Sequence, residues 1–170
     1  PKAMDFGSLT IESGGTYSAT SGVTSITSFN GTGDPVIFAN KSGGTFTHNN
    51  GTVTVTTAAN SKWIYDVGTG NINNLIINHS GYTNEIAAAL TIDGDLTITA
   101  GTLTTTSSDL ALTVTGETAI NGGTLTCNDS ACSFMTGGGA GNTYGLKISS
   151  GTFTGGTGDH TMGVFYQTGG

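Results

Sequence analysis

A four-residue motif recurs along the whole chain and constrains its fold more than any other feature. Each full copy reads Gly-Thr, then a large apolar residue, then Ser or Thr, and the copies begin 29, 26, 31, 22 and 28 residues apart. A repeat of about 20–50 residues is typical of solenoids, in which each unit stacks on its neighbours. The copies, of which the third is degenerate, are Gly15-Thr16-Tyr17-Ser18, Gly44-Thr45-Phe46-Thr47, Gly70-Asn71-Ile72-Asn73, Gly101-Thr102-Leu103-Thr104, Gly123-Thr124-Leu125-Thr126 and Gly151-Thr152-Phe153-Thr154.

Short apolar strands flank the motif. Val53 and Val55 alternate with Thr52, Thr54 and Thr56, which predicts one buried face and one exposed face. A unit with one apolar face cannot bury it alone, so the units must stack and share a core. Similar segments are Leu9-Thr10-Ile11, Val36-Ile37-Phe38, Leu96-Thr97-Ile98, Leu110-Ala111-Leu112-Thr113-Val114 and Leu146-Lys147-Ile148.

We therefore predict an all-β fold, a parallel β-solenoid of about six coils. Residues 1–170 would form a single repetitive β domain, a segment of a longer array, because neither end carries a recognisable polar cap. The alternative is an antiparallel β-sandwich, for which Asn50-Gly51 is a good hairpin signal, but that hairpin accounts for one copy and the period for all of them. In the solenoid an internal ladder would contain Tyr17, Phe46, Ile72, Leu103, Leu125 and Phe153.

Composition narrows the function. The chain has 33 Thr and 29 Gly among 170 residues, charged residues make up only 9%, and Arg is absent. A net charge of −7 leaves little to neutralise a phosphate backbone, so we expect no nucleic-acid partner. No apolar run approaches the ~20 residues that a membrane helix needs, so we expect no membrane insertion.

Candidate catalytic and metal-binding groups are few. His48, His79 and His160 lie in three different units without a shared motif, which indicates solvated turn histidines. Sugar-cleaving β-helices are similar in fold and generally place several Asp, Lys or Arg on neighbouring coils. Here Asp93 and Asp95 merely flank Gly94 as in an ordinary turn. We therefore predict no enzyme activity and no cofactor. The acidic pair and Asp159, close to a calcium-type Gly-rich spacing, are the carboxylates considered for metal, and we predict no metal site.

Two residue pairs leave alternatives open. Cys127 and Cys132 could close a disulfide across a turn or remain two buried thiols, and without a nearby His pair they make a poor zinc site. Trp63 and Tyr65 share one face of a strand, where they would pack in the core or stack on a sugar ring. The second outcome would make the chain a carbohydrate-binding β-helix.

Threonines suggest a further surface. If the apolar residue of each motif points inward, its two hydroxyl neighbours point outward, ~6.7 Å apart along the strand and ~4.8 Å between coils. Such a grid is similar to the ice-binding face of solenoid antifreeze proteins, although Asn71 and Asn73 would interrupt it. The residues of this surface would be Thr45, Thr47, Thr102, Thr104, Thr124, Thr126, Thr152 and Thr154.

Three longer segments, beginning at Ser8, Gly44 and Leu90, resemble repeat units of bacterial surface adhesins and of phage fibre or virion structural proteins. They read SLTIESGGTYSATSG, GTFTHNNGTVTVT and LTIDGDLTITAGTL. The resemblance implies a non-enzymatic structural or adhesive module of an extracellular, cell-surface or virion fibre, with no catalytic residues to transfer. Its partners would be further copies of itself, joined end to end or laterally, or a cell-surface glycan or receptor. The first residue is Pro1 and no charged-then-apolar leader precedes Asp5-Phe6, so we expect that any secretion signal has been removed or lies upstream.

Overall fold

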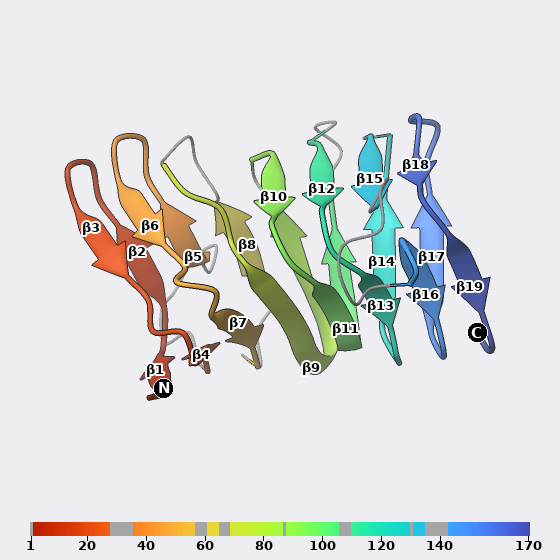
Figure 1. The fold of residues 1–170 in the computed structure, drawn as a ribbon, viewed down its shortest axis with the longest axis horizontal. Coiled ribbons are helices and arrows are strands. Elements are labelled where there is room, and N and C mark those ends of the chain that lie inside the picture. Colours follow the sequence, from red (N-terminus) through yellow and green to blue (C-terminus); the bar gives the residue numbers. More distant parts are fainter. Residues whose placement is uncertain are drawn as a thin grey trace.

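The computed structural model describes residues 2–27, 36–56, 61–64, 69–86, 88–105, 110–129, 131–134 and 143–170, with the backbone alone for 36–37 and 61–64. All the regular secondary structure in these segments is β. Figure 1 shows the strands following one another along the long axis, with the two chain ends at opposite ends of the molecule. All-β structure is therefore confirmed, and it follows from a sequence of β-branched residues separated by Gly turns.

The largest sheet has 13 strands arranged in two rows. The long strands β9 and β11 cross from one row to the other and so join the two rows. The first row is β1 (Met4–Phe6), β4 (Val23–Ile26), β7 (Thr52–Val55), β9 (Asn74–Ile86), β11 (Leu96–Thr104), β13 (Thr118–Ile120), β16 (Leu146–Ile148) and β19 (Phe165–Gln167). The second row is β2 (Leu9–Ile11), β5 (Val36–Asn40), β8 (Ser61–Ile64), the second halves of β9 and β11, β14 (Thr124–Cys127) and β17 (Thr152–Gly155).

Two smaller sheets make up what we call the third row. One pairs β3 (Thr16–Ser18) with β6 (Thr45–Thr47). The other has the order β10 (Leu90–Ile92), β12 (Leu112–Val114), β15 (Cys132–Phe134) and β18 (Thr161–Met162). Isolated parallel bridges, Thr45 with Thr69 and Ile72 with Ile92, lie between the two sheets. The chain thus runs through the first, second and third rows in turn and then returns to the first. We call one such circuit through all three rows a pass.

The described strands all pair in parallel. Partners in the first row lie one pass apart, from 19 residues between Leu146 and Phe165 to 29 between Thr24 and Val53. This arrangement is consistent with the β-solenoid, whereas the described strands contain none of the antiparallel pairs of the alternative sandwich.

The hairpin at Asn50-Gly51, on which the alternative sandwich depended, does not form. Asn49 and Asn50 have φ values of 47° and 58°, and the Gly51 amide donates to the His48 carbonyl at 2.8 Å, so a tight turn does form. However, β6 pairs with β3, while β7 pairs with β4 and β9. The turn carries the chain from one row to another instead of pairing the strands on either side of it.

The core contains columns of apolar residues that parallel pairing places one above another. In the first row one inward column is aliphatic over six consecutive passes, and its members are almost completely buried. Burial of each such side chain contributes roughly 1.5–3 kcal/mol, so the column is a main source of stability. The column is Ile26, Val55, Ile77, Ile98, Ile120 and Ile148, with half-buried Phe6 before it.

The predicted ladder of motif residues is in fact divided between two rows. Tyr17 pairs with Phe46 in the third row, and Ile72 continues that row to Ile92, not to Leu103. Leu103, Leu125 and Phe153 form their own column in the second row. The motif encodes a turn followed by a strand with one inward residue. The turn that leads into the second row and the turn that leads into the third row both require this pattern. The period of the motif therefore misses the change of row between the third and fourth copies.

Candidate functional site

Six of the eight predicted threonines form a regular outward array, which we call the threonine grid. Thr102 pairs with Thr124 and Thr124 with Thr152, while the second column runs Thr104, Thr126 and Thr154. Leu103 and Leu125 between them are fully buried, so the hydroxyls face away from the core. In regular strand geometry the grid has spacings of ~6.7 Å along a strand and ~4.8 Å between strands. Its members are half-buried in β11 and β14 and exposed in β17.

The grid extends one strand further than the sequence predicted. Exposed Thr83 in β9 lies opposite Thr102, and Glu85 lies opposite Thr104. One column therefore has four threonines, and the other begins with a carboxylate. The motif does not predict Thr83, because no Gly-Thr pair precedes it. In the structure Thr83 and Glu85 point outward on either side of buried Asn84, as expected for a strand.

Thr45 and Thr47 do not belong to this surface, so that part of the prediction is wrong. They lie in β6 of the third row, opposite Thr16 and Ser18. Asn71 and Asn73, which were expected to interrupt the grid, flank Ile72 in the third row and so lie away from it. Asn71 donates to an Asp93 carboxylate oxygen at 2.9 Å. The third row has its own outward hydroxyl column, composed of Thr91, Thr113, Ser133 and Thr161.

The histidines are not all solvated turn residues. His79 is buried with 6% exposure, and burial lowers the pKa of its imidazole. Its Nε2 contacts the Asn84 amide, while its Nδ1 has no hydrogen-bond partner among the described residues. This burial could not be predicted from the sequence, because His79 follows a surface-like Asn78 in β9, which, like β11, crosses from one row into the next.

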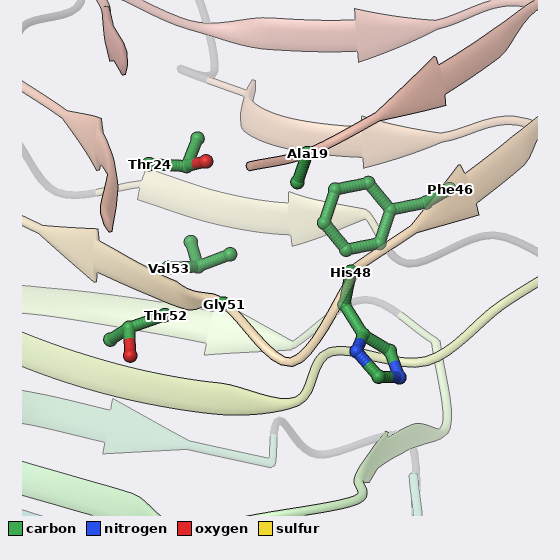
Figure 2. Close-up of a pocket in the computed structure, with 7 residues that line it drawn as sticks. All are labelled: Ala19, Thr24, Phe46, His48, Gly51, Thr52 and Val53. Carbon is green, nitrogen blue, oxygen red and sulfur yellow. The ribbon is translucent and has the colours of Figure 1, made fainter. Parts of the chain in front are cut away.

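His48 and Asp93 form a histidine–carboxylate contact, a pairing that also occurs in catalytic sites. The His48 Nε2 lies 3.5 Å from an Asp93 oxygen, and the Asn50 amide donates to His48 Nδ1 at 2.9 Å. A hollow lies beside His48 (Figure 2), but it has no room even for a water molecule. We therefore assign no catalytic role to this pair. The hollow is lined by Ala19, Thr24, Phe46, His48, Gly51, Thr52 and Val53.

The three carboxylates considered for metal binding, Asp93, Asp95 and Asp159, do not converge. Asp95 accepts the Glu117 amide at 2.8 Å, just as Asn74 one pass earlier accepts the Asp95 amide at 2.8 Å, so Asp95 positions a turn. Gly116 is needed beside it, because a Cβ there would lie 2.3 Å from the Asp95 oxygen. Asp93 is engaged by His48 and Asn71, and Asp159 is exposed. Among described residues none of the three belongs to a cluster that could hold a metal ion.

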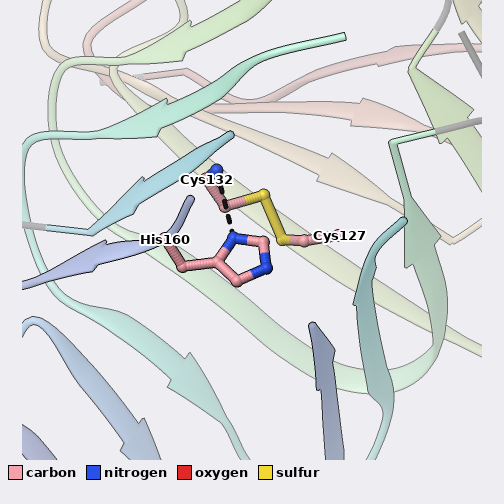
Figure 3. Close-up of side chains that lie close together, drawn as sticks. All are labelled: Cys127, Cys132 and His160. Atoms are coloured by element: carbon pink, nitrogen blue, oxygen red, sulfur yellow. Dashed lines mark hydrogen bonds between the residues drawn. A yellow bond between two sulfur atoms is a disulfide. The ribbon is translucent and has the colours of Figure 1, made fainter. Parts of the chain in front are cut away.

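Cys127 and Cys132 form a disulfide with an S–S distance of 2.14 Å. Cys127 ends β14 and Cys132 begins β15, so the bond spans the corner between the second and third rows. Both residues are fully buried, and His160 from the next pass lies against them (Figure 3). The sequence could not show this contact, since 28 residues separate His160 from Cys132.

The side chains of Trp63 and Tyr65 lie outside the described residues, so core packing and sugar stacking both stay open for this pair. Among the described residues there is no helix long and apolar enough to cross a bilayer. No protein family, curated protein or solved structure matches this chain. Function must therefore be inferred from the geometry of the chain itself.

Proposed function

We propose that the chain is a parallel β-solenoid that serves as a non-enzymatic structural module of an extracellular or virion fibre. The supporting observation is the uninterrupted first row, in which each strand pairs in parallel with the strand one pass away, from β1 to β19. A row of this kind has no intrinsic limit to its length, because every pass meets the next in the same way. Such a structure suits a stalk or fibre.

Backbone hydrogen bonds between passes would give this fibre its stiffness. Hydrogen bonds also connect the turns of neighbouring passes. The Thr52 amide donates to the Gly22 carbonyl at 2.9 Å, and the Thr152 amide donates to the Gly123 carbonyl at 2.9 Å. Passes held by both backbone ladders and buried columns cannot separate without exposing apolar surface. Bending or pulling the module would have to break many of these bonds together.

In this proposal the fibre would continue from β19, the last strand of the first row. Phe165 in β19 is 52% exposed, although it stands in register with buried Leu146 of the preceding pass. Val164 and Tyr166 beside it are also exposed. We propose that in the fibre this edge is covered, either by further passes of the same polypeptide or by a second copy. Exposed strand edges favour such pairing.

Sedimentation velocity and negative-stain microscopy test this proposal. We expect reversible association that increases with concentration, and rods whose long axis is the stacking axis. Phe165→Asp/Tyr166→Asp should weaken the association because it places charge on the open edge, whereas Thr113→Asp on the lateral third row should leave end-to-end association unchanged. Compact monomers at every concentration would contradict the self-assembling form of the proposal.

The threonine grid supports a second candidate function, binding to ice. Six threonines in two straight columns, lengthened by Thr83, present hydroxyl and methyl groups at near-constant spacing. A repeated lattice of this kind suits a repeated crystalline surface better than a single small ligand. The glycan-binding alternative depends on Trp63 and Tyr65, whose side chains lie outside the described part of the chain.

Thermal hysteresis and the shape of growing ice crystals test the second candidate. Thr124→Lys at the middle strand of the grid should abolish hysteresis if the grid binds ice, because a long charged side chain holds the surface away from the crystal. Thr113→Lys in the third-row hydroxyl column is the matched control. Wild-type protein without hysteresis or crystal shaping would exclude ice binding and leave the fibre proposal standing.

A further inference from the structure

Cys127, Cys132 and His160 form the only group of three metal-ligating side chains found among the described residues. One ligand atom from each lies within 4.8 Å of the others. His160 precedes Thr161, which pairs with Ser133, so it stands opposite Cys132 one pass further along. Figure 3 shows its ring lying directly beside the two sulfur atoms. The group therefore joins two corners of neighbouring passes.

The His160 imidazole is not committed to other strong partners. Its Nδ1 accepts the Cys132 amide at 3.4 Å, near the long limit for a hydrogen bond, and its buried Nε2 has no partner among the described residues. Packing holds the ring instead: Phe153 meets it edge to face with centroids 5.9 Å apart. A buried ring nitrogen without a strong hydrogen bond is costly, which calls for an explanation.

We propose that this group binds one Zn²⁺ ion when the disulfide is reduced. A dithiol or phosphine reductant supplies two electrons, the S–S bond breaks, and each sulfur becomes a thiol while the reductant is oxidised. Zn²⁺ then displaces one proton from each thiol and binds two thiolates and one His160 ring nitrogen. Two sulfurs and an imidazole are ligands that Zn²⁺ prefers, and three protein ligands leave a fourth position for water.

The geometry requires little movement. With Zn–S bonds of about 2.3 Å and a Zn–N bond of about 2.0–2.1 Å, tetrahedral ligand atoms lie roughly 3.5–3.8 Å apart. Once the S–S bond is broken the sulfurs must move apart to that distance, and the ring nitrogen must approach from at most 4.8 Å. The turn between β17 and β18 that carries His160 is largely exposed, so the ion has a route in.

The zinc form would replace the disulfide in a reducing compartment. The disulfide connects two strands of one pass, whereas zinc would also connect them to β18 of the next pass through His160. The chain would then have a cross-link at this corner both before and after oxidation. This inference concerns the corner alone and does not depend on the proposed fibre or ice-binding roles.

Metal titration of the reduced and oxidised chain tests the proposal. We expect the reduced protein to bind one Zn²⁺ per chain in competition with a chromophoric chelator, and the oxidised protein to bind none at this site. Co²⁺ as a probe should give thiolate charge-transfer absorption and the visible bands of a tetrahedral site, both lost when Zn²⁺ is added. Equal binding by both forms, or no binding by the reduced form, would overturn the proposal.

Variants separate the His160 ligand from simple binding by two thiols. His160→Gln should weaken Zn²⁺ binding by about tenfold or more, since even indirect support of a ligand is worth about 10–100-fold. His48→Gln, which removes a histidine from a different corner, should bind as the wild type does. Unchanged affinity in His160→Gln would refute the three-ligand site.

A measurement on the wild-type chain keeps the test decisive should His160→Gln fold poorly. Imidazole ¹⁵N resonances recorded during zinc addition to the reduced chain should shift strongly for His160 and remain in place for His48 and His79. If zinc binds and the His160 resonances do not move, the proposal fails.

Discussion

The N-terminal and C-terminal parts of the molecule use the same motif in different rows. Near the N-terminus its large residues are Tyr17 and Phe46 in the third row, where the rings stack with centroids 6.0 Å apart. Near the C-terminus they are Leu103, Leu125 and Phe153 in the second row. One local pattern therefore produces an aromatic cluster in one part and a flat threonine grid in the other.

The difference follows from how the chain fills its interior. In the N-terminal part Phe46 also meets Phe38 edge to face with centroids 5.2 Å apart, and Tyr17 meets Phe6 at 5.8 Å, so four rings form one cluster. The C-terminal part contains separate ring pairs, Phe134 with Phe153 and Tyr144 with Tyr166, and it alone has a disulfide. The aromatic cluster stabilises the first part and the disulfide the second, so the two should respond to different perturbations.

Truncation of the aromatic cluster should have the largest effect. Phe46→Ala removes a ring that is 2% exposed and touches two others, and we expect a loss of about 3–5 kcal/mol in the free energy of unfolding. Thr47→Ala on the outward side is the control, with a change within about 0.5 kcal/mol. Denaturant unfolding measures both. Because passes contact only their neighbours, amide exchange should speed up most in β3 and β6. Uniform loss of protection as far as β18 would show that the two parts unfold together.

Reduction of the disulfide should have the next largest effect, confined to the other part. In metal-free buffer with a chelator, we expect a loss of about 2 kcal/mol, the chain-entropy value for so short a loop. Amides of β14 and β15 should exchange faster while those of β3 and β6 keep their protection. The Cys127→Ala/Cys132→Ala variant must not respond to reductant; if it does, the reductant acts elsewhere.

The sequence predicted what depends on local spacing. Strand alternation, inward apolar residues such as Leu103 and Leu125, and parallel stacking of copies all follow from the repeat. It could not predict which row a copy occupies, because the Gly-Thr turn suits both corners and the pass after Ile72 is shorter than the motif spacing suggests. Contacts of His160 with Cys132 depend on the lengths of irregular corners, which leave no periodic signal.

Thr118→Val should stabilise the chain modestly. Thr118 and Thr24 occupy the same inward column of the first row, and both are almost completely buried. The Thr118 hydroxyl oxygen has no hydrogen-bond partner among the described residues, so replacing it with a methyl group of equal size should add about 1 kcal/mol. Thr24→Val, beside the hollow in Figure 2, gives the N-terminal comparison and should add less. Thermal unfolding measures both, and a destabilised Thr118→Val would mean that the hydroxyl has a partner such as buried water.

The smallest effect concerns His79, which lies in β9 where the two parts meet. Burial lowers the pKa of its imidazole in the folded chain, so the unfolded chain takes up the proton first as the pH falls. The stability due to neutral His79 is therefore fully present above the ordinary pKa of about 6.5 and is lost as the pH falls from there through the lowered value. His79→Gln should be less sensitive to acid than the wild type in urea unfolding measured across that range, and His48→Gln should retain the His79 contribution. Identical acid sensitivity in His79→Gln and the wild type would show that the junction tolerates a charged imidazole, and hence that water reaches the boundary between the aromatic and disulfide-bonded parts.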